Sequence, residues 1–64
     1  MIKLYFYPAT NQLIDSLLED FCYQWDARTG AFIFEEEEDL VDNLELSLQK
    51  IFDLNNISGY FEAV

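Results

Sequence analysis

The apolar residues of this chain change their spacing several times within 64 residues, which limits the folds open to it. Ile2 to Tyr7 is rich in β-branched and aromatic residues, ends at Pro8 and therefore predicts a strand. Apolar residues point to both of its sides, so we expect a central strand covered on both faces. Apolar residues then recur at a spacing of three and four, which is typical of an amphipathic helix: Leu13, Ile14, Leu17, Leu18 and Phe21. Thr10 or Asn11 would cap this helix.

The segment from Cys22 to Trp25 can be interpreted in two ways. It either continues the first helix or forms the first arm of a hairpin. We favour the hairpin, because Asp26 suits the start of an Asx-type turn and Gly30 stands where a left-handed residue is needed. The stretch from Ala31 to Glu35 then predicts the second arm.

A second helix is expected after the acidic residues Glu36 to Asp39, because negative charge is favourable at a helix N-terminus. Asp39 and Asp42, three residues apart, predict a capping arrangement. Leu46 and Leu54 fall off the expected buried stripe. That stripe consists of Leu40, Val41, Leu44, Leu48, Ile51 and Phe52.

The remaining residues complete an α+β pattern. Asn55 and Asn56 end the second helix, and Tyr60 to Val64 predicts a short edge strand. We expect a single domain over residues 1–64, with a small single-layer sheet and two helices on one face, in the ferredoxin-like order β-α-β-β-α-(β). The alternative order is β-α-β-α-β, with one long first helix.

Charge and composition narrow the functions open to the chain. Thirteen acidic residues face three basic ones, which gives a formal net charge of −10. Hydrophobic residues make up 52% and aromatic residues 17%, which excludes an acidic disordered chain. A domain of this size buries roughly 60% of its unfolded surface. We therefore expect some apolar surface to stay exposed or to meet another chain, including a second copy in a homodimer through the surplus aromatic surface.

The residues needed for catalysis are poorly represented. The chain has no histidine and no glycine-rich phosphate loop, and Cys22 is its single cysteine, expected as a small buried residue. We expect no enzymatic activity, no cofactor and no metal site. The chain shows no signal peptide pattern and no stretch of membrane-spanning length, so a cytoplasmic location is expected. Its three cations, Lys3, Arg28 and Lys50, are too few for direct binding to nucleic acid, and we expect no membrane binding.

The acidic residues are the candidate partner-binding surface. On a helix, carboxylates three or four residues apart lie ~5–6 Å from one another. That spacing is comparable to the spacing of phosphates along DNA, so a rigid set can occupy a basic groove in their place. The ordinary alternative is a solvated surface. The candidates are Glu35, Glu36, Glu37, Glu38, Asp39, Asp42 and Glu45, with Asp15, Glu19 and Asp26 from the first half.

In size, acidity and lack of catalytic residues, the chain resembles phage-encoded inhibitor proteins that mimic DNA. These include anti-CRISPR, anti-restriction and uracil-DNA glycosylase inhibitor proteins. The resemblance rests on the composition and on the acidic run Glu35 to Asp39. It implies a small acidic inhibitor that blocks a basic DNA- or RNA-binding surface of another protein. The alternative is an intracellular interaction module, such as an antitoxin, an immunity protein or a small subunit, with an apolar interface.

Overall fold

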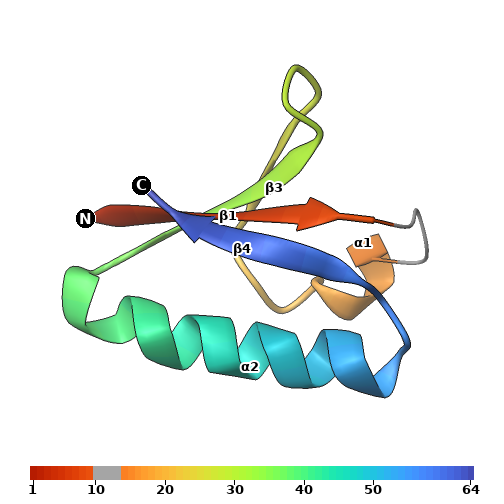
Figure 1. Cartoon of the computed structure of the whole chain (residues 1–64). Helices are drawn as coiled ribbons and strands as arrows, with labels where there is room; N and C mark the ends of the chain where they lie inside the picture. Colours follow the sequence, from red (N-terminus) through yellow and green to blue (C-terminus); the bar gives the residue numbers. More distant parts are fainter. Residues whose placement is uncertain (10–13) are drawn as a thin grey trace.

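A computed structural model describes residues 1–9 and 14–64 and contains one four-stranded antiparallel sheet (Figure 1). Its strands lie in the order β2-β3-β1-β4. The expected α+β class, with a sheet and two α-helices, is confirmed. Along the chain the elements are β1 (Ile2–Pro8), α1 (Ile14–Leu17), β2 (Gln24–Asp26), β3 (Ala31–Glu36), the 3₁₀ turn η1 (Glu38–Leu40), α2 (Val41–Leu54) and β4 (Gly59–Ala63).

A hairpin joins β2 to β3, as the residues at its turn predict. The carboxylate of Asp26 accepts hydrogen bonds from the backbone N–H of Arg28 at 3.0 Å and from the hydroxyl of Thr29 at 2.9 Å. Gly30 has a φ of +72° and donates its N–H to the carbonyl of Asp26 at 2.8 Å. The alternative prediction of one long first helix is wrong, because Gln24–Asp26 pairs with residues 31–33 as a strand.

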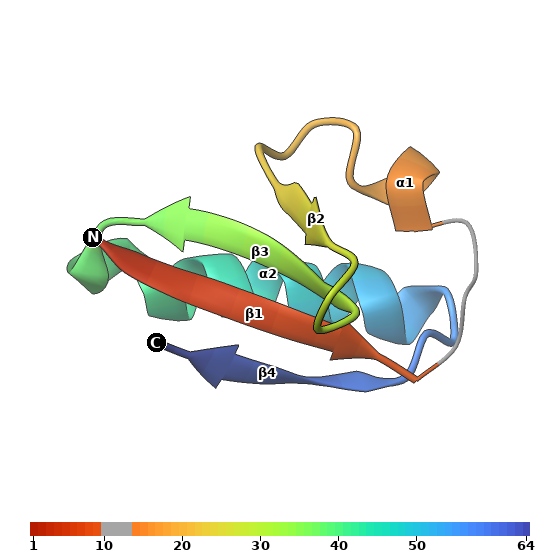
Figure 2. The same cartoon turned by 90° about the horizontal axis from the view of Figure 1, so that it is seen from above.

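The first helix ends earlier than the spacing of its apolar residues predicts. The caps proposed at Thr10 or Asn11, and Leu13, lie outside the described residues. From residue 14 on, the helix covers Ile14–Leu17, and the N–H of Phe21 bonds back to the carbonyl of Leu18 at 2.9 Å in a closing turn. The buried Ile14 and Leu18 hold this segment against the core, at the end of the molecule where β1 finishes (Figure 2).

The hydrophobic core lies between α2 and one face of the sheet (Figure 1). At its centre the ring of Phe6 stacks on Phe52 at 4.2 Å and lies 4.8 Å from Phe61. Leu46 and Leu54 are exposed, as their place off the helical stripe predicts. The buried members of the core are Leu4, Phe6, Ile14, Leu18, Phe32, Phe34, Val41, Leu48, Phe52 and Ile57.

The start of α2 differs from the predicted start. Leu40 is the N-cap, and no side chain bonds to the exposed N–H groups there. The capping role predicted for Asp39 is therefore wrong, because Asp39 lies within the 3₁₀ turn that precedes the helix. This turn also carries Leu40 out of the buried stripe, and 44% of its surface is exposed.

Strand β1 is central, as predicted, but it is covered on one face only. It pairs with β3 on one side and with β4 on the other. Leu4 and Phe6 point into the core, whereas Tyr5 and Tyr7 point to the opposite face and stay partly exposed. Among the described residues, α2 is the one helix long enough to cover a sheet face, so the expected second cover is absent.

Candidate protein-binding surfaces

All thirteen carboxylate side chains belong to described residues, and none of them is buried. Within residues 1–9 and 14–64 a single ion pair is present, between Nζ of Lys3 and Oε1 of Glu35 at 3.9 Å. Both side chains are about half exposed, and surface pairs of this kind contribute little to stability. Most of the negative charge therefore faces solvent and is available to a partner.

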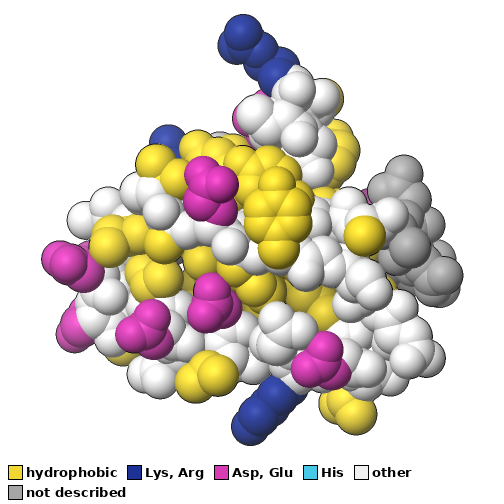
Figure 3. All heavy atoms as spheres, in the orientation of Figure 1, with side chains coloured by type: hydrophobic (Ala, Val, Ile, Leu, Met, Phe, Trp, Pro, Cys, Tyr) yellow, Lys and Arg dark blue, Asp and Glu magenta, His cyan; other side chains and the backbone are white. Residues whose placement is uncertain are grey.

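The carboxylates of Glu36 to Asp39, Asp42 and Glu45, here called the helix-end carboxylates, gather around the start of α2. Figure 3 shows acidic side chains at its lower left, over η1 and the first half of α2. Glu36 is partly buried, and its Oε1 accepts the backbone N–H of Glu37 at 3.0 Å. Negative charge at this position is favourable to the exposed N–H groups of the helix.

Asp15, Glu19 and Asp26 lie toward the opposite end of the molecule, near α1 and the hairpin (Figure 2). Two of these carboxylates are engaged within the protein. Asp15 accepts the hydroxyl of Tyr23 at 3.1 Å, and burial together with this bond raises the pKa of Tyr23. The hydrogen bonds from Thr29 and Arg28 lower the pKa of Asp26. The structure thus divides the predicted acidic residues between two ends and does not gather them on one face.

A row of tyrosines crosses the sheet face that α2 leaves uncovered, and we call this surface the open face. The rings of Tyr7 and Tyr60, which are opposite each other in the register, stack at 4.8 Å. The ring of Tyr5 lies 6.2 Å from that of Tyr7. Because opposed residues of paired strands share a face, the register adds Ile33 and Glu62, both opposite Tyr5. Tyr60 is 60% exposed, and the other two tyrosines are partly buried.

Carboxylates surround this tyrosine row. Burial raises the pKa of Tyr7, and the negative charge of Glu62 and, more weakly, of Asp26 raises it further. The pair of Lys3 and Glu35 lies at the other end of the open face, since Lys3 and Glu35 are opposed in the register. Sequence reasoning missed these tyrosines as a surface. The available signal was that the outer positions of β1 carry hydroxyl-bearing rings, which tolerate water, whereas its inner positions carry Leu and Phe.

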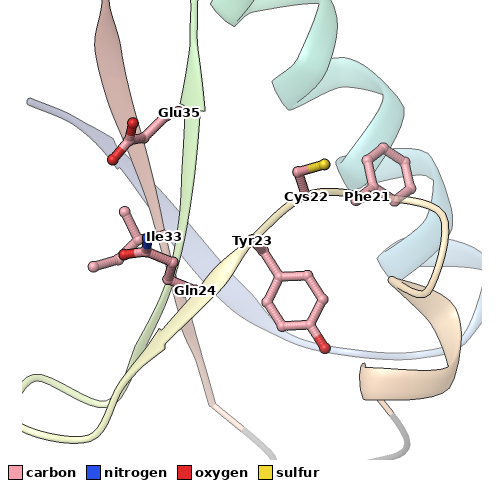
Figure 4. Close-up of a pocket in the computed structure, with 6 residues that line it drawn as sticks. All are labelled: Phe21, Cys22, Tyr23, Gln24, Ile33 and Glu35. Carbon is pink, nitrogen blue, oxygen red and sulfur yellow. The ribbon is translucent and has the colours of Figure 1, made fainter.

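A shallow pocket of about 430 Å³ opens where β2 leaves the sheet (Figure 4). Cys22 lies at this pocket and is exposed, so its expected place as a buried hydrophobic residue is wrong. The reason is the shortness of β2, which pairs only with residues 31–33, so that the chain diverges from β3 before it reaches Cys22. The lining residues are Phe21, Cys22, Tyr23, Gln24, Ile33 and Glu35.

The described residues contain neither a membrane-spanning helix nor a cluster of metal ligands, and comparison with known proteins gives no match. Across residues 1–9 and 14–64, no helix is long and apolar enough to pass through a bilayer. In the same part of the chain, no group of three or more Cys, Asp or Glu side chains is placed to hold a metal ion. No family model, curated protein or solved structure among those compared matches the chain.

Proposed function

We propose that this protein is a small acidic inhibitor that mimics nucleic acid and blocks a basic DNA- or RNA-binding surface of another protein. The observation that carries the proposal is that none of the thirteen carboxylate side chains is buried, and that only Glu35 forms an ion pair with a cation of the described residues. The chain acts by occupying a surface and not by catalysis. Partners of this kind are CRISPR effectors, restriction enzymes, glycosylases and polymerases, and the proposed location is the cytoplasm.

The physical basis is electrostatic complementarity. A net charge of −10 on a domain this small attracts a basic surface over a distance of about one Debye length, ~8–10 Å at physiological salt. Such attraction mainly speeds and orients association, whereas aromatic side chains are frequent anchors of the final contact. The same charge repels nucleic acid and anionic membranes, so we propose that neither is bound directly.

The proposal is tested by capture from lysate at low salt, with and without competing duplex DNA. We expect captured proteins that bind nucleic acid, loss of capture when DNA is added, and a steep fall of affinity with salt. The purified partner should then lose DNA binding when this protein is added. Capture that is insensitive to both DNA and salt would contradict the proposal.

Two double variants locate the contact. Glu37→Gln with Glu38→Gln removes two helix-end charges, and Glu19→Gln with Asp20→Asn removes two charges at the opposite end. None of these four side chains accepts a hydrogen bond from another described residue, and all four are exposed. Since the loss of net charge is equal, a difference between the variants reports on position. We expect the helix-end variant to weaken binding more, by roughly fivefold, which is about 1 kcal/mol.

The exposed apolar side chains favour a second candidate function, an interaction module with an apolar interface. Leu46 and Leu54 on α2 are 61% and 84% exposed. Such a module, for example an antitoxin, an immunity protein or a small subunit, would use its charge mainly for solubility. Affinity that persists in high salt and falls on Leu54→Ser would favour this candidate over the nucleic-acid mimic.

We also propose that the fold is a reduced ferredoxin-like arrangement. The element order, with a strand, a short helix, two strands of a hairpin, a long helix and a final strand, supports this assignment. The term reduced refers to the first helix, which ends at Leu17, well before the hairpin begins at Gln24. An experimental structure in which α1 extends across the sheet, or in which β4 does not pair with β1, would decide against this description.

A further inference from the structure

We propose that the open face is the contact surface for an extended, arginine-rich segment of the basic partner. This inference rests on the proposed function and gives it a location and a chemistry. The occupant is a segment whose guanidinium groups stack on the tyrosine row and pair with the carboxylates beside it. Three features of the open face support this choice: the arrangement of its rings, the sign of its charges and its freedom from internal cover.

The tyrosine row offers flat ring surfaces at the spacing of neighbouring side chains. The rings of Tyr7 and Tyr60 are stacked at 4.8 Å with an interplanar angle of 19°, so each ring covers one face of the other. Tyr60 is 60% exposed, and Tyr5 extends the row along β1. A guanidinium group is planar and weakly hydrated, so it stacks on an aromatic ring, whereas an ammonium group is more strongly hydrated.

The charges on the open face have the sign that this occupant requires. Glu62 and Asp26 act on the hydroxyl of Tyr7, and Glu35 lies farther along the face. The one cation on the register of this face is Lys3, which is 3.9 Å from Glu35. A carboxylate accepts two parallel hydrogen bonds from one arginine, so a ring and a nearby carboxylate together recognise both parts of the guanidinium.

The same charges argue against the two other occupants of such a face. A second copy of the chain in a twofold dimer would bring Glu62 and Glu35 of one copy toward the carboxylates of the other, which is unfavourable. A nucleic acid could stack its bases on the tyrosines, but its phosphates would meet the same carboxylates. A basic polypeptide is therefore the occupant that satisfies both the rings and the charges.

The test is an NMR titration of the ¹⁵N-labelled protein with an arginine peptide of about eight residues and with the matching lysine peptide, at about 0.15 M salt. We expect saturable binding of the arginine peptide, with the largest shifts at the open face, and weaker binding of the lysine peptide. The residues that should respond most are Tyr5, Tyr7, Ile33, Tyr60 and Glu62.

Matched variants separate stacking and pairing from net charge. Tyr60→Thr removes an exposed ring while keeping strand propensity, and its control is Trp25→Thr, which removes an exposed ring from the other side of the sheet. Glu62→Gln removes one charge from the open face. Its control, Asp53→Asn, removes one charge from α2 and can still accept the bond from Gln49. We expect each open-face variant to weaken arginine-peptide binding by roughly three- to fivefold and each control by less than about twofold. A thermal melt of each variant confirms that it is folded.

Several outcomes would overturn the inference. Chemical shift changes confined to the helix-end carboxylates would refute the open face as the contact surface, and the mimic proposal would still stand. Equal losses of affinity in the open-face variants and their controls, or the absence of saturable peptide binding, would have the same consequence. Equal affinity for the arginine and lysine peptides would refute the stacking. Chemical shift changes of open-face residues that grow with protein concentration in the absence of peptide would show that a second copy of the chain occupies this face. The mimic proposal itself fails separately, if capture of partners is insensitive to competing DNA.

Discussion

Replacing Gly59 by alanine tests how closely β4 approaches the core. A Cβ atom at this position would lie 2.5 Å from Cζ of Phe6 and 2.6 Å from the carbonyl oxygen of Tyr7. Carbon atoms in good contact are separated by ~3.5–4.0 Å, so one of these groups must move by about 1 Å. Phe6 has little room to move, because its ring stacks on Phe52 at 4.2 Å and lies 4.8 Å from Phe61.

The expected magnitude follows from this overcrowding. Inserting a methyl group into a well-packed core costs typically ~1–3 kcal/mol. Replacement of glycine lowers the entropy of the unfolded chain and returns ~0.4–1 kcal/mol. A carbonyl of the neighbouring strand is less able to yield than a side chain, so we expect a net loss of about 1–2 kcal/mol in the free energy of unfolding. A core in a domain this small rarely supplies more than ~3–5 kcal/mol, so the effect is easily measured.

The assay is urea unfolding followed by far-UV circular dichroism, with Gly30 as the matched control. Gly30 has the opposite character, because its φ is +72° and a Cβ there would meet nothing within 4 Å. Gly30→Ala should therefore destabilise through backbone strain, by about 1 kcal/mol, and Gly30→Asn should recover part of the loss. At Gly59, asparagine should be at least as harmful as alanine, since the cause there is volume.

A loss below ~0.5 kcal/mol in Gly59→Ala would refute the close approach of β4 to Phe6. A double-mutant cycle with Phe6→Leu gives a second criterion, because leucine lacks the Cζ atom that the new methyl group would meet. In the Phe6→Leu background, Gly59→Ala should cost less than it does in the wild type. Additive losses would show that the two sites do not touch.

Three further predictions follow from burial and hydrogen bonding. Leu48→Ala should cost ~2–5 kcal/mol in urea melts because Leu48 is fully buried, whereas Leu46→Ala on the exposed side of the same helix should stay within ~0.5 kcal/mol. The pKa of Asp26 is lowered in the fold, so the stability that Asp26 adds is fully present above its ordinary value of 3.8 and is lost as pH falls below it. The difference in urea midpoint between the wild type and Asp26→Ala should accordingly shrink at low pH, and a constant difference would contradict this. Cys22 is exposed, so an aromatic disulfide reagent should label it in the folded protein, and a requirement for denaturant would count against the loop that carries it.

The elements with strong periodicity are those that the sequence predicts well. The three- and four-residue spacing in α2 places Leu48 and Phe52 in the core, and both are buried. The β-branched and aromatic residues of β1 predict a central strand, and β1 pairs with a strand on each side. The turn at Asp26 and Gly30 is also predictable, because its chemistry is local. These signals depend on neighbours within a few residues, which the sequence displays directly.

The features that were missed depend on contacts distant in sequence. The periodic stretch that ends at Phe21 is cut short because the chain must return to the sheet edge to place Gln24 beside Ile33. The predicted cap at Asp39 fails because a 3₁₀ turn moves the helix start to Val41. The tyrosine row is formed by β1 and β4, which are far apart in the chain, so no local pattern joins Tyr7 to Tyr60.

The two acidic surfaces of this protein have different physical explanations, and this decides which of them is the more informative. The helix-end carboxylates lie where α2 exposes N–H groups, so their charge is favourable to the fold even without a partner. Their density alone therefore needs no binding function. Glu62 has no such compensation, because it lies on an edge strand beside Tyr7, whose phenol pKa its charge raises. A carboxylate that forms no ion pair within residues 1–9 and 14–64, next to an uncovered row of rings, adds to self-repulsion without an evident gain for the fold. A binding role explains Glu62 and the tyrosines together, so a partner that contacts the helix-end carboxylates should also be sought at the open face.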